Sequence, residues 1–192
     1  GENEGFVGNE GVTWDVTGTL TNVGETANTF TYELKEGTKK GNYDIQKVEG
    51  TLKVNPVTDE VIVEIKGNTS TVTYNGEEQS VEGYSVTIPK DSAYTEKYFT
   101  FNGDKKAKGT DAGEYKMGLT ESQFKNNNAN FTNVRFVVED GKLTISKRKV
   151  KLTSGSANKT YDGTALTKKE VTASTGENEG FVGNEGVTWD VT

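Results

Sequence analysis

The sequence predicts a mostly β protein of two tandem small β-modules, each a sandwich or a β-grasp-like sheet with one short helical turn at most. Short stretches in which apolar and polar residues alternate recur along the 192 residues, as in half-buried strands. Glycine, at 23 residues, and frequent Asn supply turns between such strands. Only 31% of the residues are hydrophobic, which suits two thin cores better than one thick core.

The alternating segments predict the strands in chain order. They are 12–17, 29–34, 43–48, 51–55, 61–66, 70–74, 84–88, 97–101, 114–119, 131–138, 142–147, 150–154 and 170–173. The one helical pattern is 119–125, where Thr120 and Gln123 have the spacing of a capping box. Glu49-Gly50 and Asp140-Gly141 each separate two alternating segments and predict hairpin turns.

Two identical segments indicate a repeat. Residues 1–17 and 176–192 both read GENEGFVGNEGVTWDVT, at an offset of 175 residues. Such identity indicates recent duplication in a longer array, of which the chain covers one period and 17 further residues. The abrupt start at Gly1 also suggests that the chain is excised from a longer protein.

A weaker repeat divides this period roughly in half. Thr73-Tyr74-Asn75-Gly76 matches Thr160-Tyr161-Asp162-Gly163, which lies 87 residues later. Similar segments follow both motifs in the same order, which predicts two homologous modules. One module is complete at 57–149. The other is split, with its N-terminal part at 150–192 and its C-terminal part at 1–56.

The recurring motifs also resemble a known group. They are Lys159-Thr160-Tyr161-Asp162-Gly163-Thr164, an Asn-Val-Gly or Asp-Ala-Gly before a strand, and a closing Gly-Asn-Tyr…Glu-Gly-Thr-Leu-Lys-Val. Together they resemble the YDG/MBG-type repeats of bacterial cell-surface proteins and adhesins. The resemblance covers nearly the whole chain and implies an extracellular location on a wall-anchored bacterial surface protein.

The central motif residues are interpreted as structural. Asn75 stands where the second module has Asp162, and both residue types favour turns. The positions given this structural role are Tyr74, Asn75, Gly76, Tyr161, Asp162 and Gly163.

Charge and composition argue against several functions. The net charge of −7 disfavours nucleic acid and anionic lipid as main partners. The longest aliphatic run, 61–63, is too short to span a membrane. The absence of Cys and His removes disulfides, thiol catalysis and the usual general bases. We therefore predict a protein that is not an enzyme and uses no cofactor, with its scattered carboxylates at solvated edges and turns.

Two further kinds of site have simpler explanations. Residues 1–11 are rich in Glu and Asn oxygens, but their spacing matches no calcium loop, so no metal site is predicted. A Lys–Asn isopeptide crosslink needs a buried Lys, Asn and carboxylate together, and no Lys or Asn stands in an apolar strand context.

Aromatic residues supply the candidate ligand surface. Exposed Tyr and aromatic rings can stack on sugars. The ligand-contact candidates are Tyr94, Tyr98, Phe99 and Phe101. Trp14, by contrast, shares a strand face with Val12 and Val16, which favours core packing for Trp14 and for its copy Trp189.

These observations predict a structural stalk or spacer repeat that holds a distal binding region away from the cell. The alternative is an adhesin module that itself binds a host glycan or matrix protein. Neighbouring repeats would be the main partners. Because the identical ends 1–17 and 176–192 would compete for one place, a head-to-tail exchange between chains is also expected.

Overall fold

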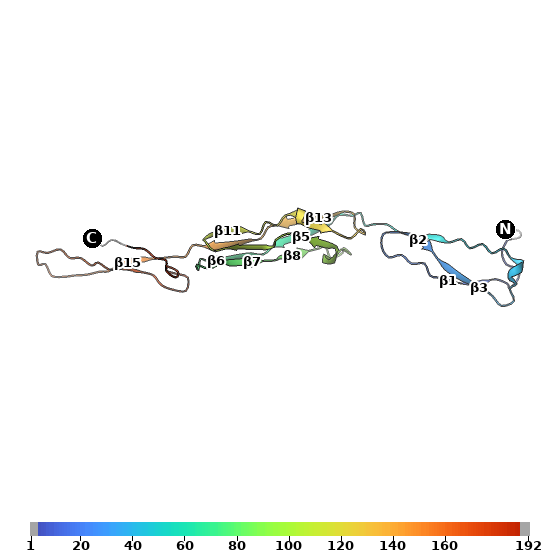
Figure 1. Cartoon of the computed structure of the whole chain (residues 1–192), viewed down its shortest axis with the longest axis horizontal. Coiled ribbons are helices and arrows are strands. Elements are labelled where there is room, and N and C mark those ends of the chain that lie inside the picture. The colour runs from blue at the N-terminus through green and yellow to red at the C-terminus, as the bar shows by residue number, and fades with distance from the viewer. Residues whose placement is uncertain (1–3, 189–192) are drawn as a thin grey trace. The chain divides into compact units, whose positions relative to one another are not determined.

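The computed structural model describes residues 4–188 and confirms a mostly β protein of small separate sheets (Figure 1). The chain forms two compact units. One includes residues 4–60 and 127–134, and the other includes 61–126 and 135–188. Among the described residues no helix is long and apolar enough to cross a membrane.

Ten strands and two short turns form the module in the middle of the chain. The strands are β5 (Val61–Gly67), β6 (Thr69–Thr73), β7 (Gln79–Glu82), β8 (Tyr84–Thr87), β9 (Phe99–Phe101), β10 (Lys106–Gly109), β11 (Gly113–Lys116), β12 (Phe124–Asn126), β13 (Val134–Glu139) and β14 (Lys142–Ser146). They make four sheets with the orders β13-β5-β8, β11-β14-β6, β10-β7 and β12-β9. The sequence pattern did not predict β7, β10 and β12, which are three or four residues long.

The first two strands of this module lie beside its last two. β13 lies beside β5, and β14 lies beside β6 in a second sheet (Figure 1). β6 and β14 are parallel, with Thr69 opposite Lys142 and Thr73 opposite Ser146. Asp140-Gly141 therefore does not turn the chain back on itself, and the hairpin predicted there is wrong.

Gly141 has a different physical role. A Cβ built on Gly67 would lie 2.2 Å from the backbone N of Gly141, so the two main chains touch where the strands pass from one sheet into the other. Glycine is required at such close backbone approaches. The Asp140 carboxylate accepts hydrogen bonds from the N–H groups of Gly118 (3.2 Å) and Leu119 (2.9 Å), which fixes the neighbouring loop.

The core forms where these first and last strands meet. Val63 and Leu143 are completely buried, and Ile65 and Ile145 are 2% exposed. Aromatic rings extend the core, with centroids 4.8 to 6.0 Å apart in tilted, stacked and edge-on pairs. The rings belong to Tyr84, Phe99, Phe101, Phe124 and Phe136.

The module contains two 3-10 turns, η2 (Glu96–Tyr98) and η3 (Glu121–Gln123), one more than expected. The second confirms the turn expected at 119–125, since the Thr120 N–H donates to the Gln123 side chain at 2.8 Å. It ends directly at β12, so the rest of that segment is strand. The first turn closes through the Tyr98 N–H, because the chain must bend before β9.

Residues 12–54 form two isolated strand pairs and one 3-10 turn, η1 (Lys40–Asn42). β1 (Val12–Val16) pairs with β3 (Phe30–Leu34), and β2 (Gly24–Asn28) pairs with β4 (Gly50–Val54). Residues 43–48 are not a strand, contrary to the prediction, and no hairpin forms at Glu49-Gly50. In the complete module the corresponding strand is β13, which pairs with β5. The segment that corresponds to β5 lies near residues 148–154, at the other end of the sequence.

The last part of the chain keeps the weaker repeat in register. β15 (Leu152–Ser154) is antiparallel to β16 (Val171–Ala173), with Leu152 opposite Ala173. In the complete module Ile65 is opposite Val86, and each of these residues lies 87 positions before its counterpart.

Apolar residues that the repeat buries in one module are exposed in the other. Val150 and Leu152 are 37% and 48% exposed, whereas their counterparts Val63 and Ile65 are 0% and 2% exposed. Trp14 is 69% exposed, so the core packing predicted for it is not observed. The physical reason is that, among the described residues, no third strand pairs with β1 or β3, and Trp14 lines an open cavity. Trp189 lies outside the described residues.

These burial differences predict unequal effects of equivalent substitutions. Ile65→Ala should destabilise the complete module by about 2–5 kcal/mol, because it leaves a cavity in the core. Leu152 is the repeat counterpart of Ile65 and is already exposed. Leu152→Ala should therefore change the stability of its own segment by less than about 0.5 kcal/mol. Urea unfolding, monitored through hydrogen exchange of the amides, measures the effect of both substitutions: the β5 and β14 amides report on the complete module, and the β15 and β16 amides report on the segment of Leu152. Equal losses of stability in the two variants would contradict the difference in burial between Ile65 and Leu152.

Candidate functional site

The segment after the complete module folds back onto the end of that module. We call this region the joint and define it as residues 147–150 and 176–185 together with Tyr74. All of it lies in the second compact unit. Lys149 and Glu179 form a parallel bridge, and the Gly180 N–H donates to the Lys149 carbonyl at 2.8 Å.

Arg148 holds the joint together. Its Nε donates to the carbonyl of Gly180 at 2.9 Å, and one Nη donates to the carbonyls of Gly176 and Glu179 at 3.0 Å each. A guanidinium presents five donors in a fixed planar fork, which allows one side chain to bind three carbonyls of one loop.

Gly180 is buried at the centre of these contacts. Its φ is +86°, and an added Cβ would lie 2.3 Å from the carbonyl oxygen of Ser174. Both the backbone conformation and the available space therefore require glycine at this position.

A second contact closes the joint. The Tyr74 hydroxyl donates a short hydrogen bond to the Glu185 carboxylate, and this bond, followed by partial burial, raises the pKa of Tyr74. An open cavity of about 340 Å³ lies here. Its lining consists of Tyr74, Asp111, Ala112, Lys147, Arg148, Val150, Gly180, Phe181 and Glu185.

The identical segments fold alike but bind different partners. The Glu10 N–H donates to the Val7 carbonyl at 3.1 Å, and the Glu185 N–H donates to the Val182 carbonyl at 2.9 Å, so the same turn forms in both copies. Glu10 accepts a short hydrogen bond from the hydroxyl of Tyr43, whereas Glu185 accepts one from Tyr74. Over the described residues the two copies thus contact different tyrosines.

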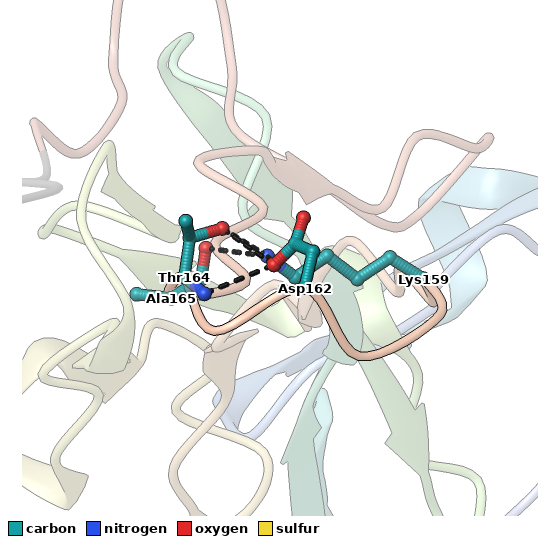
Figure 2. Close-up of polar contacts among 4 residues, drawn as sticks. All are labelled: Lys159, Asp162, Thr164 and Ala165. Carbon is teal, nitrogen blue, oxygen red and sulfur yellow. Dashed lines mark hydrogen bonds and ion pairs between the residues drawn. The ribbon is translucent and has the colours of Figure 1, made fainter.

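The Tyr-Asp-Gly motif forms a compact polar turn (Figure 2). Asp162 accepts from Lys159 Nζ at 2.8 Å, and from the N–H and hydroxyl of Thr164 at 2.9 and 2.7 Å. These bonds, led by that from Lys159, lower the pKa of Asp162 to about 2. Gly163 has a φ of +74°, as such a turn requires.

The complete module has the same turn. The Asn75 side chain accepts from the Glu77 N–H at 3.0 Å, which matches the bond between Asp162 and Thr164 at an offset of 87. Gly76 has a φ of +81°. Asn and Asp therefore supply one acceptor at the same position of the turn, in line with the structural role expected for both.

The tyrosines before these turns differ in their surroundings. Tyr74 packs against the cluster of Ala107, Leu143 and Ile145, and reaches Glu185. Tyr161 is 93% exposed. Tyr74 is covered by residues of β10 and β14. The repeat places the counterparts of these two strands at residues 1–56, far from Tyr161 in the sequence.

The candidate ligand-contact residues lie in and around the aromatic core. Tyr94 is 3% exposed, and burial raises its pKa to about 12. Its hydroxyl donates within the protein, toward the Tyr98 carbonyl and the Asn126 side chain. Tyr98, Phe99 and Phe101 are half-buried. A ligand-contact role for these four residues stays a prediction.

The polar segment considered for calcium is only partly described, since residues 1–3 lie outside the described range. Within the described part of this segment, Glu10 accepts a hydrogen bond from the Tyr43 hydroxyl. The described residues contain no group of three or more acidic side chains that could hold a metal ion.

Sequence reasoning missed Arg148 and Glu185. Lys147-Arg148-Lys149 reads as a charged linker, and nothing in its pattern shows that one of the three basic residues turns inward to bind carbonyls. The duplication that contains Glu10 and Glu185 was the available signal, because it isolates a segment with a conformation of its own.

The middle of the chain matches a known protein family. Residues 61–147 match the family model of the MBG domain, which confirms the resemblance to MBG-type modules for this part of the chain. No curated protein and no solved structure gave a match.

Arg148→Ala should loosen the joint without unfolding the module. Loss of three charge-assisted hydrogen bonds should speed hydrogen exchange at the Gly180 amide by at least about tenfold. Lys149→Ala removes the same charge next door and is the control. Equal exchange rates in both variants would show that Arg148 does not hold the loop.

The turn at Asp162 predicts a local pH response. Since the pKa of Asp162 is lowered to about 2, its carboxylate contacts should persist below the ordinary value of 3.8 and break as the pH falls through about 2. Lys159→Ala removes the main cause and should return the pKa toward 3.8. Carboxyl NMR titration measures both, and an unchanged pKa in the variant would refute the assignment.

Proposed function

We propose, from the MBG domain at residues 61–147, that the chain is a stalk or spacer repeat of a bacterial cell-surface adhesin and extends a distal binding region. The role is mechanical and requires no catalytic group or cofactor. The protein would lie outside the cell on the bacterial surface, where a Cys-free chain needs no disulfides for its fold.

The observation that carries this proposal is the parallel pairing of β6 with β14. β6 belongs to the first extended segment of the module, and β14 is its last strand. Tension applied at Val61 and Ser146 would pull two parallel neighbours in opposite directions. The hydrogen bonds between them lie across the pulling direction and would be loaded together, so they must break together.

The joint supports the same role. A spacer must transmit force and limit bending between successive domains, and short charged connections restrict bending more than flexible Gly/Ser linkers. Arg148 and Tyr74 attach the following segment to the module through four hydrogen bonds. The duplicated segment 176–192 would provide the same attachment in each period of an array.

Force spectroscopy on the full chain, pulled from its ends, tests the proposal. The Tyr74 N–H donates to Ser146 and the Lys142 N–H to Asn68, so even-numbered residues of β6 face β14. Ser70→Pro should therefore remove ladder bonds and raise the forced-unfolding rate at least about tenfold. Thr71→Pro places the proline toward the edge and is the matched control. Equal effects would show that the β6–β14 ladder does not resist the pulling force.

The alternative function, an adhesin module that binds a host glycan or matrix protein, has a separate readout. A spacer should give no signal on arrays of glycans and matrix proteins. Binding that is lost on substitution of Tyr98 or Phe99 would replace the spacer role with that of a ligand-binding module.

A further inference from the structure

The sequence contains two Asn-Gly pairs, and both lie in the complete module, at Asn75-Gly76 and Asn102-Gly103. In such a pair the main-chain nitrogen of the glycine can attack the side-chain amide carbon of the asparagine and close a five-membered ring. Glycine has no Cβ to hinder that approach. The fate of each pair therefore depends on how the fold holds it.

The turn at Asn75 leaves the attacking nitrogen accessible. Asn75 and Gly76 are both exposed, and they lie between β6 and β7, outside either strand. Among the described residues the Gly76 N–H donates to no acceptor. Solvent can therefore remove its proton, which the attack requires.

The side-chain carbonyl of Asn75 is held and polarised by the turn. Its oxygen accepts a hydrogen bond from the Glu77 N–H at 3.0 Å. When the Gly76 nitrogen adds to the carbon of this carbonyl, negative charge develops on the same oxygen. The Glu77 N–H stabilises that charge, as a donor of an oxyanion hole does. The hydrogen bond also fixes the amide beside the turn, which lowers the entropy cost of ring closure.

The second Asn-Gly pair is packed differently. The Asn102 N–H donates to the Gln123 carbonyl at 2.8 Å. A Cβ built on Gly103 would lie 2.7 Å from Gln123 Nε2 and 3.0 Å from the Phe101 ring. Because these side chains lie against the pair, ring closure at Asn102 must displace them, and the reaction there should be slower.

The repeat supplies an aspartate version of the turn at Asn75. Asp162 accepts from the Thr164 N–H at 2.9 Å, as Asn75 accepts from the Glu77 N–H. Lys159 holds the Asp162 carboxylate in its ionised form. An ionised carboxylate resists the attack, because oxide is a far poorer leaving group than ammonia. Aspartate at position 75 would therefore keep the turn and end its reactivity.

We propose that Asn75 is a site of spontaneous deamidation. The Gly76 nitrogen loses its proton to solvent and bonds to Cγ of Asn75; the bond from Cγ to Nδ2 breaks, and ammonia leaves with a proton from water. Water then opens the resulting succinimide. Cleavage of the new bond at Cγ gives aspartate, whereas cleavage at the main-chain carbonyl gives isoaspartate. The proposal rests on this turn and is independent of the spacer role.

The two products affect the turn in opposite ways. Aspartate keeps the acceptor for the Glu77 N–H and adds one negative charge. Isoaspartate lengthens the main chain by one carbon and loses that acceptor geometry. The change falls directly after Tyr74, whose hydroxyl binds Glu185, so isoaspartate should also loosen the joint.

Incubation of the full chain at mildly alkaline pH, followed by proteolysis and mass spectrometry, tests the proposal. Replacement of NH2 by OH changes the mass of each peptide measurably. In the folded chain we expect the peptide with Asn75 to convert at least about tenfold faster than the peptide with Asn102. In the chain unfolded in urea the two rates should converge, because both pairs are then equally free.

Matched variants make the test specific. Asn75→Gln should abolish conversion at this position, because glutamine would have to close a six-membered ring. Asn102→Gln makes the same change at the other pair and should leave conversion at Asn75 unaltered. Enzymatic methylation of isoaspartate distinguishes the two products, and Asn75→Asp provides the pure aspartate form for comparison. Amide exchange of β5 and β14 checks that the module stays folded throughout.

Three results would overturn the proposal. The first is a folded chain that keeps Asn75 intact under conditions in which the unfolded chain converts it. The second is conversion at Asn102 that equals or exceeds conversion at Asn75 in the folded chain. The third is a product that contains aspartate without isoaspartate, because direct hydrolysis, and not the succinimide, would then be the route.

Discussion

The pairing of the first two strands of the complete module, β5 and β6, with its last two, β13 and β14, is the constraint on which the rest of the structure depends. It joins residues more than 70 positions apart and so carries a loop-closure cost, which the burial of alternate residues along these strands offsets. Val63, Ile65, Leu143 and Ile145 are buried because this pairing exists. Where the sequence separates the two partners, at residues 1–56 and 150–188, only local strand pairs form and the same kinds of side chain stay exposed.

Local and tertiary structure separate clearly in the duplicated segment. Gly8 and Gly183 have φ angles of +59° and +55°, so one backbone conformation forms in both places and must be encoded locally. The partners of Glu10 and Glu185 differ because neighbouring residues differ. A segment with its own turn thus places the same glutamate against Tyr43 in one copy and against Tyr74 in the other.

The sequence predicted what depends on local pattern and missed what depends on distant partners. Alternation located β5, β6, β13 and β14, and the matching Asx turns followed from one motif. Asp140-Gly141 gave a wrong hairpin prediction, because Asp-Gly is typical of hairpin turns. Here the aspartate instead accepts hydrogen bonds from a neighbouring loop, and the glycine allows a close backbone contact. Residues 43–48 have strand composition but no adjacent strand, and no local pattern reports that. Arg148 was missed since an inward-turned arginine has the same sequence signature as a solvated one.

The boundary of the repeat and the boundary of the folding unit are therefore different things. A period of 175 residues can begin anywhere in an array. A module whose first two strands pair with its last two, by contrast, cannot be divided without losing its core. The joint reinforces this relation, since Arg148 and Tyr74 of one module bind residues 176–185, which begin the C-terminal part of the next. In an array of such modules, the hydrogen bonds of Arg148 and Tyr74 would couple order in one module to order in the next, as the nearest-neighbour contacts of repeat proteins do.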